Sequence, residues 1–154
     1  MKNKVILLSI LSVSALLVGC SSTRLDASAS KEVPIERMHW ESGRDDDGTK
    51  SVVIVKRDRG FVGSGCYQHI HINGMKVAEL GIGEKVTLYV PPRDYILNAY
   101  LGGGGLCASL AGSLTAKILP NSSNVFRVIT NWGSAPKIIR DNDFSMEINN
   151  SVFQ

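Results

Sequence analysis

The sequence has no large excess of charge of either sign, which argues against one class of partner. Its 154 residues include 17 Lys and Arg against 14 Asp and Glu. Lys2 and Lys4 precede an apolar run, and cleavage after that run would leave 15 basic against 14 acidic residues. A nucleic-acid-binding domain normally carries a clustered basic excess. We therefore expect no nucleic-acid partner.

Histidine and cysteine are scarce, with three of each in the chain. His69 and His71 are the closest pair, and residues two apart on a strand lie on one face. A zinc site needs about four ligands in tetrahedral geometry, and no other Cys/His cluster lies near this pair. We interpret the two histidines as a pair on the solvent face of a strand, and we expect no metal and no cofactor.

The motifs of common nucleotide-binding and hydrolytic sites are also missing. Gly60, Gly63 and Gly65 are not followed by the Lys-Ser/Thr that completes a phosphate-binding loop. The Gly-x-Ser-x-Gly pattern of a nucleophile elbow does not occur. Residues 44–48 are rich in aspartate but lack the ligand spacing and the closing glutamate of an EF-hand, and we interpret them as a turn. The sequence thus predicts a protein that is not an enzyme.

Long apolar runs are limited to two. Residues 95–116 contain no charged side chain, but Gly102–Gly105 interrupts them and would cost a helix about 1 kcal/mol per glycine. We expect a loop between two strands there rather than a membrane-inserted segment. The other run, residues 5–18, follows two lysines and precedes Gly19. A basic start, an apolar stretch and a small residue at the cleavage point are typical of a secretory signal peptide.

Leu17-Val18-Gly19-Cys20, at the end of this signal, resembles the lipobox of bacterial lipoproteins. The resemblance implies that residues 1–19 are removed and that Cys20 carries a diacylglyceryl thioether and an N-acyl chain such as palmitate. Each buried methylene contributes about 0.8 kcal/mol, so several acyl chains give stable attachment. In Gram-negative lipoproteins the next residue directs sorting. Ser21 in place of aspartate implies the outer membrane, here at its periplasmic face.

The remaining chain divides into three parts by composition. Residues 20–50 are rich in serine and charged side chains and predict a flexible, lipid-anchored tether. Met38-His39-Trp40 is an exception that could pack onto the domain or lie at the membrane surface, and packing is the more ordinary choice. Residues 51–140 predict a β domain. Residues 141–154 predict a polar C-terminal tail, although alternating apolar residues in it could form an edge strand.

Short runs with β-strand patterns follow one another along residues 51–140. Tyr67–Ile72 alternates between apolar and polar residues, and Asn73-Gly74 predicts a hairpin turn into Met75–Leu80. Further strands are expected at Val52–Val55, Val86–Val90, Tyr95–Leu101, Leu114–Leu119, Val125–Thr130 and Lys137–Arg140. This pattern predicts an all-β fold, either a small antiparallel β-sandwich or a partly open barrel.

The hairpin and the strand after it resemble the small PEGA-like domains of bacterial envelope lipoproteins. The resemblance rests on Ile70–Leu80 and on Val86–Pro92, and Arg93 stands where glycine is usual. It covers roughly residues 51–101. Most members have no assigned activity, so the resemblance implies a fold more than a function.

Two cysteines remain once Cys20 is assigned to lipid. In an exported protein such a pair first indicates a disulfide, and we expect a Cys66–Cys107 bond. Loops on a rigid sheet are common carriers of recognition. The candidate binding surfaces are therefore the turn that holds Arg57, Arg59 and Phe61, and the loop Gly102–Gly105.

Together these expectations describe a lipid-anchored bacterial cell-envelope lipoprotein that acts as a non-enzymatic structural or binding module. Its partners would be membrane lipid, through the acylated cysteine, and an envelope protein. The alternative is a lipoprotein subunit or an immunity factor associated with a secretion, conjugation or toxin system. Co-purifying proteins would separate the two.

Overall fold

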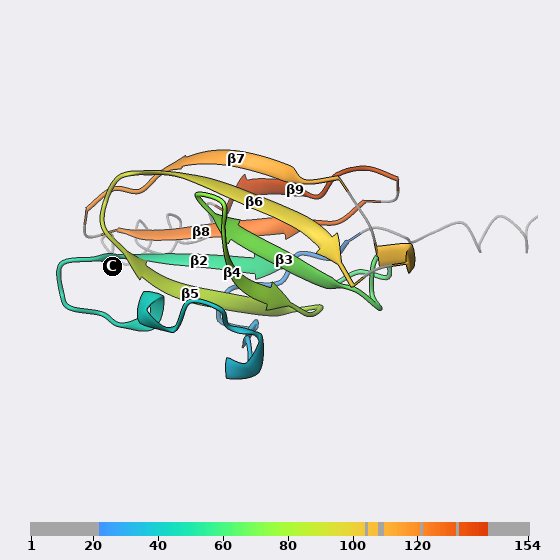
Figure 1. Ribbon diagram of the computed structural model, residues 1–154, viewed down its shortest axis with the longest axis horizontal. Helices are drawn as coiled ribbons and strands as arrows, with labels where there is room; N and C mark the ends of the chain where they lie inside the picture. Colours follow the sequence, from blue (N-terminus) through green and yellow to red (C-terminus); the bar gives the residue numbers. More distant parts are fainter. Residues whose placement is uncertain (1–21, 104, 108–109, 121, 132, 142–154) are drawn as a thin grey trace, which may run out of the picture.

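The computed structural model describes residues 22–141 except residues 104, 108–109, 121 and 132, and within them the chain forms a two-layer β-sandwich (Figure 1). The strands are β1 (Lys31–Glu32), β2 (Ser51–Arg57), β3 (Tyr67–Ile72), β4 (Met75–Leu80), β5 (Glu84–Val90), β6 (Asp94–Gly102), β7 (Gly112–Lys117), β8 (Ser123–Ile129) and β9 (Lys137–Arg140). Short 3₁₀ helices are η2 (Ile35–Arg37), η3 (Glu41–Arg44) and η4 (Gly105–Cys107). The predicted all-β sandwich is confirmed.

The two sheets differ in strand direction. The four-stranded sheet has the order β4-β3-β6-β7, and its strand pairs are antiparallel. The five-stranded sheet has the order β1-β5-β2-β8-β9 and is mixed. In it β1 runs parallel to β5, and β2 runs parallel to β8. The chain crosses to the other sheet between β2 and β5 and between β5 and β8, which permits the parallel β2–β8 pair.

The β3–β4 hairpin forms with the bounds that its sequence predicts. Asn73 and Gly74 have φ values of 49° and 80°, the left-handed backbone that a tight two-residue hairpin requires. The Asn73 side-chain oxygen also accepts a hydrogen bond from the Ile96 backbone N–H at 2.9 Å. The turn is therefore joined to β6 as well as to its own two strands.

Period-two alternation decides which side chains enter the core. On β3, the side chains of Gln68, Ile70 and Ile72 are buried, while those of Tyr67, His69 and His71 lie on the outer face. The inward residues of both sheets form one hydrophobic core, and its largest fully buried apolar members are Phe126, Ile70, Leu80, Leu88 and Leu97.

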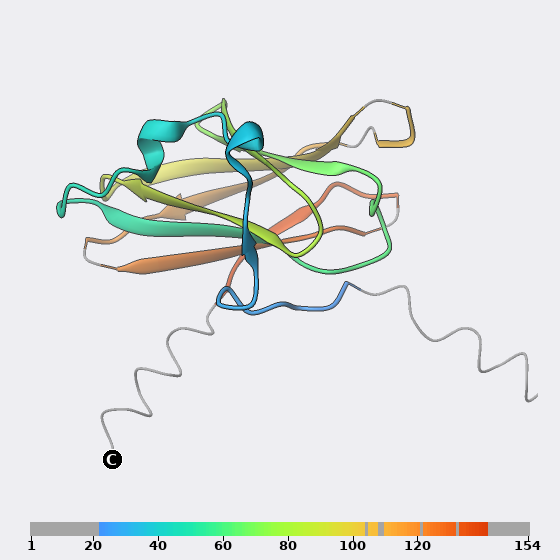
Figure 2. The ribbon, with the colours of Figure 1, turned by 90° about the horizontal axis from the view of Figure 1, so that it is seen from below.

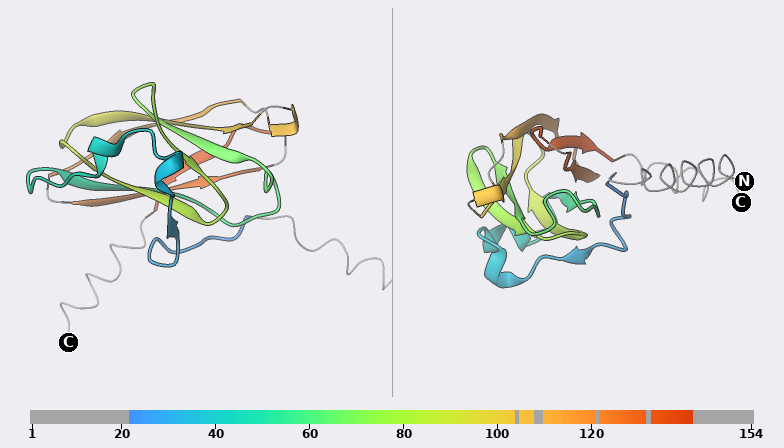
Figure 3. Two further views of the ribbon diagram at one scale, coloured as in Figure 1. Left: turned by 60° about the horizontal axis from the view of Figure 1, so that its bottom comes forward. Right: turned by 90° about the vertical axis from the view of Figure 1, so that its right-hand side faces the viewer.

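Residues 22–50 differ from the flexible tether that their composition predicts. Strand β1 extends the edge of the five-stranded sheet beside β5, and Met38 forms a β-bridge with Ala78 at the edge of the other sheet. The segment thus crosses an open side of the sandwich, as the blue and cyan ribbon shows (Figure 2; Figure 3, left). Val33 and Met38 are only 2% and 5% exposed. A few side chains that enter the core are enough to hold this segment on the sandwich, although most of its residues are polar.

The end of the β domain also extends slightly beyond its predicted boundary. Asp141, assigned by composition to the polar tail, is buried, and its backbone N–H donates to the Val125 carbonyl at 2.7 Å. The predicted edge strand over residues 144–148 lies outside the described residues.

Candidate functional site: the disulfide end

Loops that connect neighbouring strands gather at the two ends of the sandwich. The end at the right of Figure 1, called here the disulfide end, is formed by loops 58–66, 81–83, 103–111 and 130–136. The opposite end, called the acidic end, is formed by loops 45–50, 73–74, 91–93 and 118–122. The right panel of Figure 3 looks directly onto the disulfide end.

A disulfide joins the two longest loops of the disulfide end. Cys66 and Cys107 are bonded, with their Cα atoms 5.5 Å apart in space and the two residues 41 positions apart in the sequence. The predicted bond is confirmed. It connects loop 58–66 to η4, so the two candidate binding surfaces inferred separately from the sequence are parts of one surface.

Arg57 does not belong to that surface, and its prediction as an exposed binding residue is wrong. The side chain is 2% exposed and lies beneath loop 58–66. Its guanidinium donates to the carbonyl oxygens of Cys66 (2.6 Å), Gly63 (2.7 Å) and Leu80 (3.0 Å). Burial lowers the pKa of Arg57, against the opposing charge of Glu84. Three converging carbonyls make a buried guanidinium tolerable, because each satisfies part of its donor capacity.

Asp58 follows Arg57 and is also buried. One of its carboxylate oxygens accepts hydrogen bonds from Nε of Arg127, at 3.1 Å, and from the terminal nitrogen of the same guanidinium. This pair joins the end of β2 to β8. Two consecutive charged residues that the sequence places in an exposed turn therefore hold the loop onto the sandwich.

Arg59 and Phe61 are exposed, as predicted for a recognition loop. The Phe61 side chain is 75% exposed. The backbone of Arg59 pairs with Thr23 in a β-bridge: the Thr23 N–H donates to the Arg59 carbonyl at 2.6 Å, and the Arg59 N–H donates to the Thr23 carbonyl at 3.0 Å. The N-terminal segment is thereby attached to the base of this loop.

The disulfide end carries exposed apolar side chains and little charge. Leu110 is 78% exposed and Phe61 75%, the two highest values among the exposed large apolar residues, and Ile82 is also exposed. The four loops contain only two charged residues, Asp58 and Arg59. Since Asp58 is buried against Arg127, Arg59 supplies the exposed charge of these loops.

A second polar cluster ties the N-terminal segment to the sandwich. Lys56 and Asp141 form a buried ion pair at 2.5 Å, and Arg24 contacts the other oxygen of Asp141 at 2.5 Å. The Lys56 ammonium also donates to the Leu25 carbonyl. Burial raises the pKa of Asp141, but the hydrogen bonds from Arg24 and Lys56 outweigh it, so that the net pKa lies below the ordinary value.

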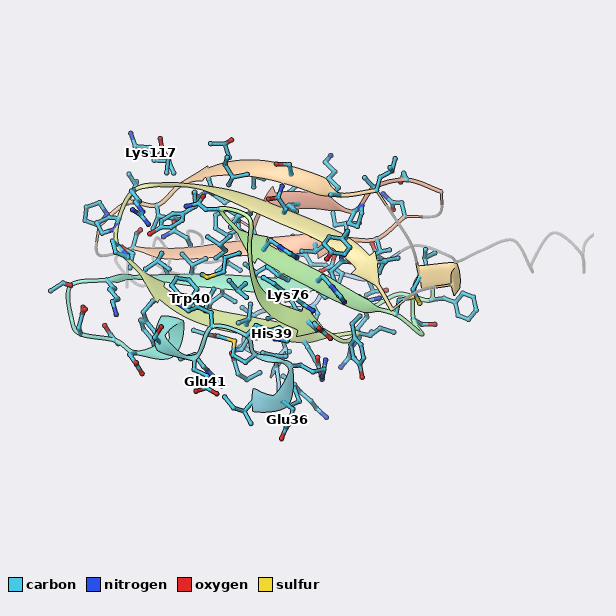
Figure 4. The ribbon with its side chains drawn as sticks, in the orientation of Figure 1. Glu36, His39, Trp40, Glu41, Lys76 and Lys117 are labelled. Carbon is cyan, nitrogen blue, oxygen red and sulfur yellow. A yellow bond between two sulfur atoms is a disulfide. The ribbon has the colours of Figure 1, made fainter. Side chains whose placement is uncertain are left out.

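The outer face of the four-stranded sheet carries all three histidines of the chain. A row across the strands runs from Glu79 through His69 to Tyr100, whose hydroxyl lies 3.3 Å from the His69 ring. His39, from the N-terminal segment, lies 3.1 Å from the Glu79 carboxylate, which Lys76 also contacts. Figure 4 shows His39 and Lys76 side by side on this face. Sequence alternation identified the His69–His71 pair but could not place His39 beside them.

The chemistry of this histidine face is limited by its contacts. Burial lowers the pKa of His69, and Lys76 adds to the effect. The ring packs on Gly102, where a Cβ atom would stand 2.3 Å from Nε2, so only glycine leaves room for it. Within residues 22–141, as far as they are described, no group of three or more His, Cys, Asp or Glu side chains is arranged to hold a metal ion.

The predicted lipidation and sorting residues, Cys20 and Ser21, lie outside the described residues. The nearest described residues are Ser22 and Thr23, at the disulfide end. Across the part of the chain that is described, no helix has the length and apolar character needed to span a membrane.

Comparison with known proteins adds no assignment. No family model matches the chain. No curated protein and no solved structure matches it significantly either. The resemblances to the lipobox and to PEGA-like domains therefore stay predictions, and any functional conclusion rests on the residues and geometry described above.

Proposed function

We propose that this chain is a lipid-anchored bacterial envelope lipoprotein that works by contact rather than by catalysis. The observation that carries the proposal is the signal pattern ending at Leu17–Cys20, together with the position of Thr23. Three positions after the cysteine, Thr23 is already bonded to the sandwich.

The disulfide supports an exported location. Disulfides persist in the periplasm and outside the cell, whereas cytosolic thiols are kept reduced. A signal peptide and a disulfide in one short chain are consistent with each other. Both agree with a domain that folds after export.

The buried polar groups support contact over catalysis. Perturbed ionisable groups often mark catalytic sites, but they also occur in structural ion pairs. Arg57 holds three carbonyls, Asp58 holds Arg127, and Asp141 holds Lys56 and Arg24. Each group joins side chains or backbone from different segments of the chain. The exposed loops of the β domain are then the expected sites of contact with a partner.

Intact-mass analysis of protein extracted from membranes tests the anchor. We expect loss of residues 1–19 and an added diacylglyceryl and acyl mass on Cys20. The Cys20→Ala variant should accumulate as unprocessed precursor. Wild-type protein that is water-soluble, unmodified and still begins at Met1 would contradict the proposal.

Fractionation on a sucrose gradient tests the outer-membrane location. We expect the wild type to sediment with outer-membrane markers and the Ser21→Asp variant with inner-membrane markers. If both forms sediment with the inner membrane, the sorting part of the proposal is wrong while the anchor stands.

Replacement of the histidine pair separates contact from catalysis. In cells with a deletion phenotype, the His69→Gln and His71→Gln double variant should restore the wild-type phenotype, because glutamine keeps polar contacts but cannot exchange protons near pH 7. Loss of rescue at normal protein level would indicate proton-transfer chemistry and would contradict the non-catalytic proposal.

A further inference from the structure

We propose that the disulfide end rests on the lipid surface that holds Cys20, with Phe61 and Leu110 in the headgroup region and Arg59 beside lipid phosphates. This inference rests on the proposed lipid anchor. It adds an orientation: one end of the sandwich meets the membrane, and the acidic end points away from it.

Only a short length of chain separates the proposed lipid anchor from the fold. Thr23 is held to Arg59 by two backbone hydrogen bonds of 2.6 and 3.0 Å. The three residues from Cys20 to Thr23 can span at most about 10 Å when fully extended. Acyl chains on Cys20 would lie in the hydrocarbon, so the cysteine itself would lie at headgroup level. The base of loop 58–66 must then lie within about 10 Å of the headgroups.

The attachment of Thr23 is also firm, because the segment behind it is integrated into the sandwich. Arg24 is paired with Asp141, the Leu25 carbonyl accepts from Lys56, and Val33 enters the core. Pulling Thr23 away from loop 58–66 would not simply release a linker. A lipid anchor on this segment therefore constrains the orientation of the domain and not merely its distance from the membrane.

The end of the sandwich nearest the anchor exposes large apolar side chains. Its loops carry Phe61 and Leu110, the two most exposed large apolar side chains among those described. Aromatic and aliphatic side chains are favoured where one part of a molecule meets the acyl boundary and the rest stays in water. A lipid surface would bury these exposed apolar side chains next to the acyl anchor.

The two ends of the sandwich also differ in the charge of their loops. In the loops of the disulfide end the exposed charge is the Arg59 guanidinium, and the one carboxylate, Asp58, is buried. At the acidic end, the exposed carboxylates of Asp45, Asp46 and Asp47 outnumber the two basic residues of its loops, Lys50 and Arg93. Anionic phospholipids attract basic side chains and repel acidic ones. The charge asymmetry therefore favours the same orientation as the anchor does.

Photo-crosslinking in vesicles tests this orientation. The probe is p-benzoylphenylalanine in place of Phe61, Leu110 or Leu119, in lipidated full-length protein reconstituted into phosphatidylethanolamine and phosphatidylglycerol vesicles. Leu119 is the matched control for Leu110, because it is an exposed leucine at the acidic end. We expect lipid adducts from positions 61 and 110 and none above background from position 119.

Flotation of the same samples separates this inference from the proposed anchor. Protein that floats with the vesicles but gives equal adducts at 61 and 119, or none at 61, overturns the orientation and leaves the anchor intact. Protein that does not float overturns both. Crosslinking from position 61 to a protein rather than to lipid in intact cells also overturns the lipid contact and assigns this end to a protein partner.

A charge-reversal pair gives an independent readout. Arg59→Glu should lower the adduct yield at position 61, because a carboxylate would replace the guanidinium beside the lipid phosphates. Arg93→Glu, which reverses an exposed arginine at the acidic end, should leave the yield unchanged. Since Arg59 contacts Thr23 through its backbone, its side chain can be replaced without loss of the bridge. Equal yields from both variants would contradict the role of Arg59.

Discussion

The loops at the two ends of the sandwich are stabilised by different kinds of contact. At the acidic end the connections are mostly short and are held by local bonds. The Asp46 and Asp47 side chains accept hydrogen bonds from the backbone N–H groups of Gly48 and Thr49, both at 2.9 Å. At the disulfide end, two longer loops are held by a covalent bond and by the buried Arg57 guanidinium.

This difference follows from the entropy of loop closure. A short turn restricts few residues, and one or two Asx-type bonds suffice to define it. A longer loop loses more conformational freedom on folding and needs contacts from outside itself. The disulfide end therefore combines rigid supports with exposed apolar tips, an arrangement suited to contact with a surface. The acidic end presents charge on local turns. The predictions below test whether the two ends depend on these different supports.

Removing the disulfide should have the largest effect. The Cys66→Ala and Cys107→Ala double variant should lose about 4 kcal/mol of unfolding free energy, as the chain-entropy model gives for a loop of 41 positions. Urea unfolding measures the loss, and reduced wild type should behave like the variant. Equal stability of oxidised and reduced wild type would show that the bond does not support this end.

Replacing the buried arginine should have the next largest effect. Arg57→Met removes the guanidinium that donates to three carbonyl oxygens. The Gly63 carbonyl keeps the Cys66 N–H as a donor at 3.0 Å, so at roughly 1 kcal/mol or more for each of the other two carbonyls the expected loss is about 2 kcal/mol. The matched variant at the acidic end, Arg93→Met, removes an exposed guanidinium and should change stability by less than about 0.5 kcal/mol. Urea unfolding of the two variants compares the ends directly; equal losses would refute the distinction.

The attachment of the N-terminal segment to the sandwich should weaken at low pH. The pKa of Asp141 is below its ordinary value of 3.8 in the folded protein. Its ion pairs therefore contribute stability above about pH 4, and this contribution is lost as the pH falls toward the folded-state pKa. Asp141→Asn should flatten the dependence of unfolding free energy on pH below about pH 4. An unchanged slope in that range, measured by urea unfolding, would contradict this.

The smallest effect is expected at the acidic end. The side-chain and backbone hydrogen bonds of Thr49 lower the pKa of Asp47 to about 2, with Lys50 contributing. Thr49→Val should raise this pKa toward 3.8 and leave the urea midpoint unchanged, because Asp47 is exposed. An NMR titration of the carboxyl carbon measures the shift. A large change in midpoint would mean that this end also holds the fold together.

Local patterns in the sequence predicted the parts of the site that depend on neighbouring residues. Alternation placed His69 and His71 on one face, and Asn73-Gly74 defined the hairpin. The pairing of Cys66 with Cys107 was predicted from the expected export signal and from the small number of cysteines. Arg57 was placed wrongly, because a charged residue at the end of a strand is usually exposed. Only the convergence of three carbonyls, two from loop 58–66 and one from the end of β4, makes its burial favourable.

The sequence by itself determined the all-β class, most strand positions, the central hairpin and the disulfide partners, because period-two alternation, turn chemistry and cysteine count are local or compositional properties. Only the tertiary structure decided that β2 lies parallel to β8, that residues 22–50 close the sandwich, and that His39 joins the other histidines. These features depend on which distant segments bury each other's apolar side chains. For residues 22–50, a few buried side chains such as Val33 and Met38 determine that the segment packs onto the sandwich. The sequence around them is polar on average, so composition alone does not reveal this packing.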